Sequence, residues 1–344
     1  MSAVWAQVAE VDYPAILAAA WEQHLAPRAE DAPTVVSTFA GCGGSSLGYS
    51  MAGYRELLAV EWDNNAVETF MLNFPGVPVY HGDIAKLSVE ESLRLTGLEP
   101  GQLDVLDGSP PCQGFSTAGK RNMDDDRNQL FREYVRLLRG LRPRVFIMEN
   151  VSGMVKGKMK LVFAEIMREL KASGYSVSCR LLNAMYFWVP QSRERLIFIG
   201  VRDDLGIEPS HPSALASAVS AGVACHGVVN KTFGKVLNGT QRNIWDTIRP
   251  GRSGEDYRLG YYMNTVKCAP GRPMPTILKG GGTHLHWDEA RTLTIEELKR
   301  GGSFPDEFIM TGSFAQQWSR VGNSVPPLFM RAIAGHVRRE VLNG

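Results

Sequence analysis

Short apolar runs alternate with amphipathic stretches along the first two hundred residues of the chain. Each run is short enough to form one buried strand, and several are rich in β-branched residues. They predict strands at 35–39, 57–60, 77–80, 105–106, 145–148, 176–182 and 196–200, and helices over 47–52, 65–72, 130–138 and 160–170. Strands that alternate with helices at this spacing predict an α/β fold with a doubly wound, mostly parallel sheet.

The rest of the chain has a different character. Residues 204–290 lose the alternation and gain glycine, tyrosine and basic side chains, which predicts a smaller second domain. The first 33 residues are rich in alanine and predict a packed helical extension. Residues 325–342 predict a helix, after two prolines, that returns to the first domain.

Composition excludes several classes of protein. The five cysteines are an odd number without a Cys-x-x-Cys pair, which argues against a disulfide framework or a zinc site. No apolar run approaches the roughly 18–20 residues that span a bilayer. The N-terminus also lacks the pattern of a secretory signal. We therefore expect a cytoplasmic enzyme that needs no metal.

Charge is distributed unevenly along the chain. The net charge is only +1, but residues 231–287 carry nine basic residues against three acids. A local excess of positive charge suits a surface that faces phosphates, and an ordinary solvated face explains it equally well. The nine are Lys231, Lys235, Arg242, Arg249, Arg252, Arg258, Lys267, Arg272 and Lys279.

Polar residues follow the predicted strands, where ligands of such sheets bind. The turn that contains Gly41, Gly43 and Gly44 permits close approach of a ligand to the backbone, without the spacing of a dinucleotide or Walker motif. Glu61 is suited to accept both ribose hydroxyls, Trp62 to cover an adenine, and Asp83 to accept the adenine amino group. The plainer alternatives are helix caps for the acids and a core position for Trp62. Because these three residues follow consecutive predicted strands, together they favour an adenosine ligand without a polyphosphate.

A single cysteine follows the fourth predicted strand. Pro110 and Pro111 make the turn before it rigid, because two prolines fix φ and remove two backbone donors. A cysteine considered alone is more often buried and inert. In this turn, at the end of a strand, we expect the Cys112 thiol to be displayed.

In this order the motifs resemble those of the cytosine-C5 DNA methyltransferases, over residues 35–203 and about 270–335. The matching segments are Thr38-Phe39-Ala40-Gly41-Cys42-Gly43-Gly44, Glu61-Trp62, Gly82-Asp83-Ile84, Pro110-Pro111-Cys112-Gln113-Gly114-Phe115-Ser116, Glu149-Asn150-Val151, Gln191-Ser192-Arg193-Glu194-Arg195 and Gly322-Asn323-Ser324-Val325.

The resemblance implies methyl transfer from S-adenosylmethionine to C5 of a flipped-out cytosine in a short duplex DNA sequence, leaving S-adenosylhomocysteine. Cytosine C5 is too weakly nucleophilic to react directly, so Cys112 adds to C6 first. Glu149 bonds the exocyclic amine and acts at N3. Arg193 and Arg195, two apart on an extended segment, hold the base carbonyl and shape the surroundings of the thiol.

The same resemblance assigns binding residues and domains. Cofactor contacts fall to Phe39, Ala40, Gly41, Gly43, Gly44, Glu61, Trp62, Asp83, Ile84, Asp107, Ser109, Pro110, Asn323 and Ser324. DNA contacts fall to Ser116, Lys120, Arg121, Arg127 and Gln191. The expected parts are an N-terminal extension (1–33), a Rossmann-like catalytic and cofactor-binding domain (34–203), a target-recognition domain (204–310) and a returning C-terminal segment (311–344). We expect a monomer that acts on double-stranded DNA, beside a restriction endonuclease for the same site.

Two departures from the family pattern concern the recognition region, and a third concerns the cofactor. Ser37 stands where an acid is frequent, so another group is expected to hold the methionine amino group. Glu296 replaces a commoner arginine, and Gly301-Gly302 replaces the usual Leu-Gln. Three alternatives remain: a tRNA cytosine-C5 methyltransferase on the same fold, a catalytically silent DNA-binding relative, and a dehydrogenase, which the glycine spacing disfavours.

Overall fold

The structure is a computed structural model, and it describes residues 7–8, 10–111, 126–155, 159–280 and 283–343. Its chain forms two compact units, which are described separately. The sheet unit comprises 26–182, 194–212 and 330–344, and the second unit comprises 1–25, 183–193 and 213–329. The four functional parts expected from the sequence stay a prediction, since these units are defined by internal packing alone.

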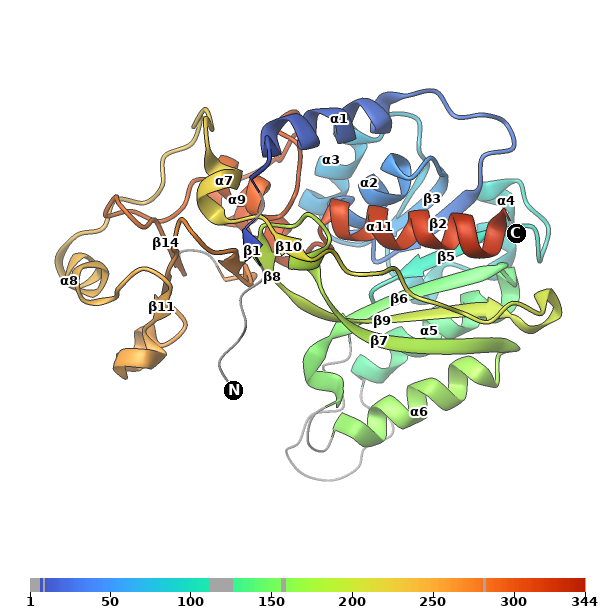
Figure 1. The fold of residues 1–344 in the computed structure, drawn as a ribbon. Helices are drawn as coiled ribbons and strands as arrows, with labels where there is room; N and C mark the ends of the chain where they lie inside the picture. Colours follow the sequence, from blue (N-terminus) through green and yellow to red (C-terminus); the bar gives the residue numbers. More distant parts are fainter. Residues whose placement is uncertain (1–6, 9, 112–125, 156–158, 281–282, 344) are drawn as a thin grey trace. The chain divides into compact units, whose positions relative to one another are not determined.

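A seven-stranded sheet forms the centre of the sheet unit, in the order β4-β3-β2-β5-β6-β9-β7 (Figure 1). Its first five strands are parallel, and β9 runs antiparallel to β6. The expectation of a mostly parallel α/β sheet is confirmed. The strands are β2 (Thr34–Thr38), β3 (Arg55–Glu61), β4 (Val79–His81), β5 (Val105–Gly108), β6 (Val145–Val151), β7 (Tyr175–Asn183) and β9 (Glu194–Arg202).

Helices cover both faces of this sheet (Figure 1). Tyr134, Ile166 and Leu170 belong to the helices of one face and are buried in a single core with Phe146 and Phe198 of the strands. The helices are α2 (Gly44–Met51), α3 (Asn64–Asn73), α4 (Val89–Thr96), α5 (Asp126–Leu141), α6 (Met159–Lys171) and α11 (Pro327–Val337), and a π-helical turn (Arg338–Leu342) follows the last of them.

Helix α4 was missed in the sequence, although its signals are local. Ser88 caps its first turn by accepting a hydrogen bond from the Glu91 amide at 3.0 Å, and Gly97 ends it with a φ of 70°. A serine three residues before a glutamate, with glycine at the far end, is typical of helix boundaries. The helix is only eight residues long, and its apolar side chains are Val89, Leu93 and Leu95, so the signal in the sequence is short.

The second unit is built from short elements. Its core contains Trp318, Leu293, Leu298, Met274 and Ile277, all buried. The helices are α1 (Tyr13–Leu25), α7 (Ala221–Cys225), α8 (Gly239–Thr247), α9 (Ile295–Gly301) and α10 (Phe314–Asn323). The strands pair as β1 (Gln7–Val8) with β10 (Ser217–Ala218), β8 (Gln191–Ser192) with β13 (Met274–Pro275), and β11 (Arg252–Ser253) with β12 (Val266–Lys267) and β14 (His284–Leu285).

The N-terminal extension contains the predicted helix. Helix α1 buries Tyr13, Leu17 and Ala20 and packs on α7 within the second unit. In the part of the chain that the structure describes, none of the helices has the length and apolarity to cross a membrane.

Close packing between β6 and β9 makes the sheet sensitive to a single methyl group. Gly200 pairs with Phe146, and a Cβ at Gly200 would lie 1.9 Å from the Phe146 ring. We predict that Gly200→Ala lowers the free energy of unfolding by about 1–3 kcal/mol, because the ring must leave its rotamer. Urea denaturation measures this. Gly153→Ala, where a Cβ meets nothing within 4 Å, is the control, and equal stability of the two variants would contradict the prediction.

Candidate active site

The carboxyl ends of the parallel strands meet at one edge of the sheet, and most of the predicted residues follow them directly. The glycine turn follows β2, Trp62 follows β3, Asp83 follows β4 and Ser109 follows β5. Glu149 lies near the end of β6. Parallel order therefore brings together segments that are far apart in sequence.

The glycine turn has backbone angles that few side chains tolerate. Phe39, Gly41 and Gly43 have φ values of 55°, 57° and 95°. A Cβ on Gly43 would lie 2.4 Å from the Phe74 ring, so this glycine is needed for packing. A Cβ on Gly41 would meet no atom within 4 Å. The backbone at Gly41 is therefore open to close approach by a ligand. Ala40 is buried, and Gly44 begins α2.

Glu61 braces this turn. Its Oε2 accepts a hydrogen bond from the Gly41 amide at 2.8 Å, and its Oε1 accepts from the amides of Trp62 and Asp63, both at 2.9 Å. A carboxylate offers about four acceptor positions, so three are used by the chain itself. The expectation that Glu61 binds both ribose hydroxyls did not include this bonding of backbone amides. The sequence shows only that an acid follows a strand near a glycine turn, and it does not show which amides the acid binds.

Trp62 and Asp83 have surroundings that separate the alternatives weighed for them. Trp62 is 77% exposed, so the interpretation as a core residue is wrong. Asp83 is exposed and accepts from the Ala85 amide at 3.0 Å, which makes it the cap of a short helix. Its second oxygen remains for a ligand. Ile84 is buried in the sheet core.

Two acids with buried carboxyl groups lie on the strands that flank β2: Asp107 on β5 and Glu56 on β3. Asp107 accepts hydrogen bonds from the Ser45 hydroxyl at 2.6 Å and the Tyr49 hydroxyl at 3.2 Å, and burial raises its pKa to about 7. Burial also raises the pKa of Glu56 to about 8, and its carboxyl lies beside the hydroxyls of Ser37 and Ser46. Sequence reasoning missed Ser45, Tyr49 and Glu56. The four-residue spacing of Ser45 and Tyr49 on α2 was the only available signal.

Glu149 and Arg195 form an ion pair at the end of β6. Arg195 Nε lies 2.6 Å from Glu149 Oε1, and the two side chains are 14% and 11% exposed. The next residue, Asn150, donates from Nδ2 to the Pro110 carbonyl at 3.1 Å. This bond ties the strand that carries Glu149 to Pro110, two residues before Cys112 in the sequence. Ser109 is half-buried and Pro110 is buried.

Arg193 and Arg195 have different partners. The extended segment is interrupted at Arg193, between β8 and β9. The Arg193 guanidinium is buried in the second unit and donates to the carbonyls of Ile277 at 3.1 Å and Gly322 at 3.0 Å. Two residues of one motif are thus bound within different units.

Other predicted residues also belong to the second unit. Gln191 is 1% exposed, donates to the Gly301 carbonyl and accepts from the Ile277 amide. Its amide is used inside the unit, so we do not retain it as a DNA contact. Asn323 is exposed at the end of α10, and the Ser324 hydroxyl donates to the Arg320 carbonyl at 2.7 Å.

The predicted loop falls mostly outside the described residues. Cys112, Ser116, Lys120 and Arg121 lie there, and Arg127 is on α5 without a described side chain. Their assignments stay predictions.

The basic residues of 231–287 are mainly at the surface. Eight of the nine are exposed, and Lys267 is the exception. Its ammonium lies 3.4 Å from the centre of the Trp245 ring and donates to the Trp245 carbonyl at 3.1 Å. Burial lowers the pKa of Lys267. The surface interpretation is therefore wrong for Lys267.

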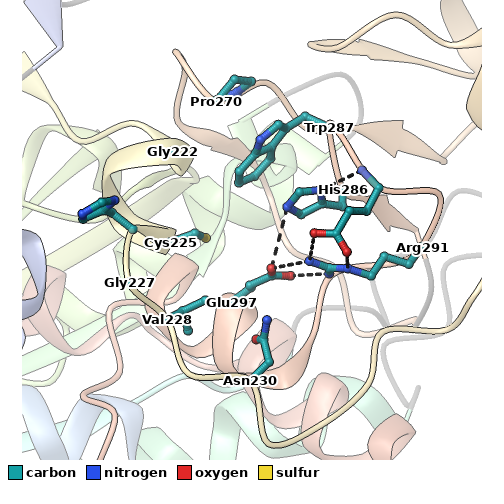
Figure 2. Close-up of a pocket in the computed structure, with 12 residues that line it drawn as sticks. Gly222, Cys225, Gly227, Val228, Asn230, Pro270, His286, Trp287, Arg291 and Glu297 are labelled. Atoms are coloured by element: carbon teal, nitrogen blue, oxygen red, sulfur yellow. Dashed lines mark hydrogen bonds and ion pairs between the residues drawn. The ribbon is translucent and has the colours of Figure 1, made fainter.

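A pocket of about 430 Å³ lies within the second unit (Figure 2). Cys225, Trp287, His286 and Glu297 are among its lining residues. Burial lowers the pKa of His286, whose Nε2 lies 3.8 Å from Glu297. The carboxylate of Glu297 is occupied by Arg291 at 2.8 Å, so the polar wall is bonded within itself.

The sheet order, the glycine turn and the acid–arginine pair together define a Rossmann-like methyltransferase. The sequence model for C-5 cytosine-specific DNA methylases matches residues 34–249 and 226–339. Type II methyltransferase M1.HphI of Haemophilus parahaemolyticus is 35% identical over 326 residues, covering 88% of this chain and 85% of that protein. Type II methyltransferase M.DdeI of Desulfomicrobium norvegicum is 31% identical, covering 88% of each.

Solved structures agree on the fold. A DNMT2 variant from Spodoptera frugiperda superposes with a TM-score of 0.67 at 19% identity, covering 87% of this chain and 98% of that one. Dnmt2 of S. pombe gives 0.61 at 18% identity, covering 89% and 98%. The chain belongs to the C-5 cytosine-specific DNA methylase family.

The buried Glu56 predicts a pH dependence of stability. An unfolded glutamate has a pKa of about 4.3, and the folded value is about 8. The folded state therefore binds the proton more tightly, and this stabilisation is present below about pH 4 and lost as the pH rises through 8. At about 1.4 kcal/mol for each unit of pKa difference, we expect wild type to lose on the order of 5 kcal/mol relative to Glu56→Gln across this range. Urea unfolding at several pH values measures it, and parallel curves would contradict it.

Proposed function

We propose that this protein methylates C5 of cytosine within one short duplex DNA sequence, through a covalent bond between Cys112 and C6. Its family supports S-adenosylmethionine-dependent DNA methylation. The observation that carries the catalytic assignment is the Glu149–Arg195 pair, held at the end of β6 and tied through Asn150 to Pro110, two residues before Cys112 in the sequence.

The residues at the sheet edge fit S-adenosylmethionine, which supplies the methyl group as part of a sulfonium. Gly41 leaves backbone open to a ligand, Trp62 offers an exposed ring, and Asp83 offers one carboxylate oxygen. We assign the adenosine to these three residues. Phe39 and Ile84 complete this part of the site.

The family often has an acid at the position of Ser37, where it would bind the amino group of the methionine part of the cofactor. In this chain another group must bind that amino group. Asp107 and Glu56 are the acids beside β2, and the Glu56 carboxyl lies next to the Ser37 hydroxyl. Asp107 is already bonded by Ser45 and Tyr49. We propose that Asp107, whose raised pKa of about 7 leaves it partly ionised near neutral pH, favours the cationic ammonium near Ser109 and Pro110.

Covalent activation follows from the chemistry of cytosine. The Cys112 thiolate forms a bond to C6, and the electron pair of the C5–C6 double bond moves toward C5 and the N3 side of the ring. As negative charge builds on N3, Glu149 acts in its protonated form and donates a hydrogen bond to N3, while its other oxygen accepts from the exocyclic amine. C5 then takes the methyl group, and the electron pair of the broken sulfur–methyl bond stays on the sulfur of S-adenosylhomocysteine. A base removes the C5 proton, the electrons of the C5–H bond re-form the C5–C6 double bond, and the bond between C6 and the Cys112 sulfur breaks to regenerate the thiolate.

Arg195 has a positioning role in this scheme. Its guanidinium holds the Glu149 carboxylate at 2.6 Å, on adjacent antiparallel strands. Two partly buried opposite charges hold each other in one orientation, which a single exposed carboxylate does not achieve. Arg193, bonded to two carbonyls, fixes the segment before it.

DNA recognition is proposed to lie in the second unit and in the loop that follows Cys112. The exposed basic residues between 231 and 279 suit contact with phosphates. Ser116, Lys120, Arg121 and Arg127 are assigned to the DNA that surrounds the flipped base. Because the named relatives are Type II methyltransferases, we also propose a restriction endonuclease that shares the recognition sequence.

We predict that base-resolution methylation sequencing of a methylation-free host expressing this chain finds 5-methylcytosine in one short motif. Cys112→Ala abolishes it, because no other residue supplies the covalent bond. Absence of methylation in DNA, followed by methylation of tRNA in the same assay, would overturn the assignment in favour of an RNA methyltransferase. Equal methylation by Cys112→Ala would refute the covalent mechanism.

We predict that Glu149→Gln lowers the single-turnover methylation rate by about 10²–10⁴-fold, as expected for loss of a positioned acid. Asp104→Asn is the matched control, because Asp104 pairs with Arg144 at 3.1 Å at the opposite end of the strands. A rate for Glu149→Gln equal to that of the control would remove Glu149 from the chemistry.

A further inference from the structure

The segment 230–237, here named the strap, crosses the second unit beside α9 and is fastened along its whole length. Lys235 and Thr292 exchange hydrogen bonds: the Lys235 amide donates to the Thr292 hydroxyl at 2.9 Å, and the Thr292 amide donates to the Lys235 carbonyl at 3.0 Å. The Leu237 amide donates to the Ala290 carbonyl at 3.0 Å. The backbone of the strap is therefore fixed.

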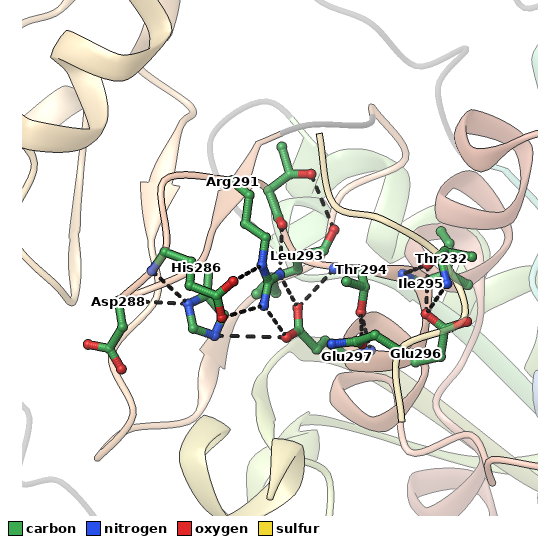
Figure 3. Close-up of polar contacts among 12 residues, drawn as sticks. Thr232, His286, Asp288, Arg291, Leu293, Thr294, Ile295, Glu296 and Glu297 are labelled. Carbon is green, nitrogen blue, oxygen red and sulfur yellow. Dashed lines mark hydrogen bonds and ion pairs between the residues drawn. The ribbon is translucent and has the colours of Figure 1, made fainter. Parts of the chain in front are cut away.

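The other end of the strap is fastened by the residue that departs from the family pattern. Glu296 Oε2 accepts from the Thr232 hydroxyl at 2.6 Å and the Thr232 amide at 3.2 Å (Figure 3). The Thr232 hydroxyl in turn accepts from the Ile295 amide at 3.0 Å. An arginine at position 296 could not accept these bonds. Glu296 is thus coupled to the conformation of the strap.

Close packing leaves no room to change the middle of the strap. Gly234 is buried, and a Cβ on it would lie 2.2 Å from the Thr292 carbonyl oxygen. Beneath this contact, Arg291 and Glu297 form a two-pronged ion pair at 2.8 Å with Glu297 3% exposed on its side chain. The strap therefore lies on a rigid base.

This rigid strap presents an aromatic ring to solvent. Phe233 is 93% exposed, and the lysines on either side, Lys231 and Lys235, are exposed too. A scattered apolar residue on a surface is ordinary. Here, however, the chain holds the flanking backbone by side-chain and backbone bonds, and two cations flank the ring. An apolar group between cations suits duplex DNA, which offers phosphates together with thymine methyl groups in the major groove and base steps that an apolar side chain can wedge open.

We propose that the strap is a DNA-contacting element in which Phe233 packs against bases while Lys231 and Lys235 meet the neighbouring phosphates. Phe233 is then a determinant of binding and site selection, and Glu296 is a positioning residue for it. This inference rests on the proposed function, because it takes duplex DNA as the ligand. It adds a contact outside the loop of Cys112.

The test separates the two kinds of contact by their response to salt. Phosphate contacts release counterions, so their contribution falls as salt rises, whereas an apolar contact with a base does not depend on salt in this way. The probe is a labelled duplex carrying the motif found by methylation sequencing, with a scrambled duplex beside it. Affinity of the full-length protein is measured by fluorescence anisotropy across about 50–200 mM salt.

We expect Phe233→Ala to weaken binding to the motif duplex by about tenfold at every salt concentration. Lys235→Gln should instead lower the slope of log affinity against log salt by about one. Phe233→Trp should retain affinity. Val229→Ala removes another exposed apolar side chain, 75% exposed, and is the matched control. Because Phe233 is exposed, its removal should leave the melting temperature unchanged.

The role of Glu296 has its own readout. Glu296→Gln keeps an acceptor for Thr232 and should retain most of the affinity, whereas Glu296→Arg should weaken binding as Phe233→Ala does. The double variant of Glu296→Arg and Phe233→Ala should be no weaker than either single one. Additive losses would show that Glu296 does not act through the ring.

The outcomes distinguish this inference from the function it rests on. Wild type that methylates DNA, with Phe233→Ala binding as tightly as Val229→Ala, overturns the strap proposal alone. Wild type that neither methylates nor binds duplex DNA overturns both. A loss of affinity for Phe233→Ala that disappears at high salt would make the contact electrostatic and would also overturn the proposal.

Discussion

Parallel strand order is the constraint on which the site depends. It gathers the carboxyl ends of five strands at one edge, and it leaves backbone amides there without partners in the ladder. Glu61 answers that need directly, since its carboxylate binds three amides from two different segments. The same side chain that was expected to face a nucleoside is therefore what gives the glycine turn its shape. The Glu61 carboxylate therefore shapes the folded turn and is also the group expected to contact the ligand.

Burial of acids near β2 is the second organising feature. Burial raises the pKa of both Asp107 and Glu56, and the Asp107 carboxyl adds to the rise in the pKa of Glu56. Hydroxyls of Ser37, Ser45, Ser46 and Tyr49 surround them. A cation that enters such a region favours the ionised form of these acids, and water screens it less than it screens a cation beside an exposed acid. The missing acid at Ser37 is consistent with this arrangement.

The sequence was sufficient for the sheet and for the order of the motifs, since strands such as 145–148 are strongly apolar and glycines mark the turns. It was insufficient where a side chain serves an unexpected partner. Gln191 and Arg193 look like ligand-binding residues, yet both bond to carbonyls or amides inside the second unit. Helix α4 was lost because its apolar face is small, and Glu56 was lost because its burial depends on residues from another element. The local sequence pattern predicts the hydrophobic periodicity of helices and strands well. It does not predict which polar residues will bond to each other across long sequence separations.

The attachment of the strap also bears on how recognition can evolve. Several of its bonds use main-chain atoms of 232–237, so the path of the chain does not depend on which side chains stand at 231, 233 and 235. Substitutions at these three positions alter the chemistry offered to a ligand while the folded framework is preserved. On the proposed role of the strap, a gene that drifts at these codons acquires a new target without passing through an unstable intermediate. Because the backbone of the strap is held by its own bonds, the side chains at 231, 233 and 235 can change without loss of the fold.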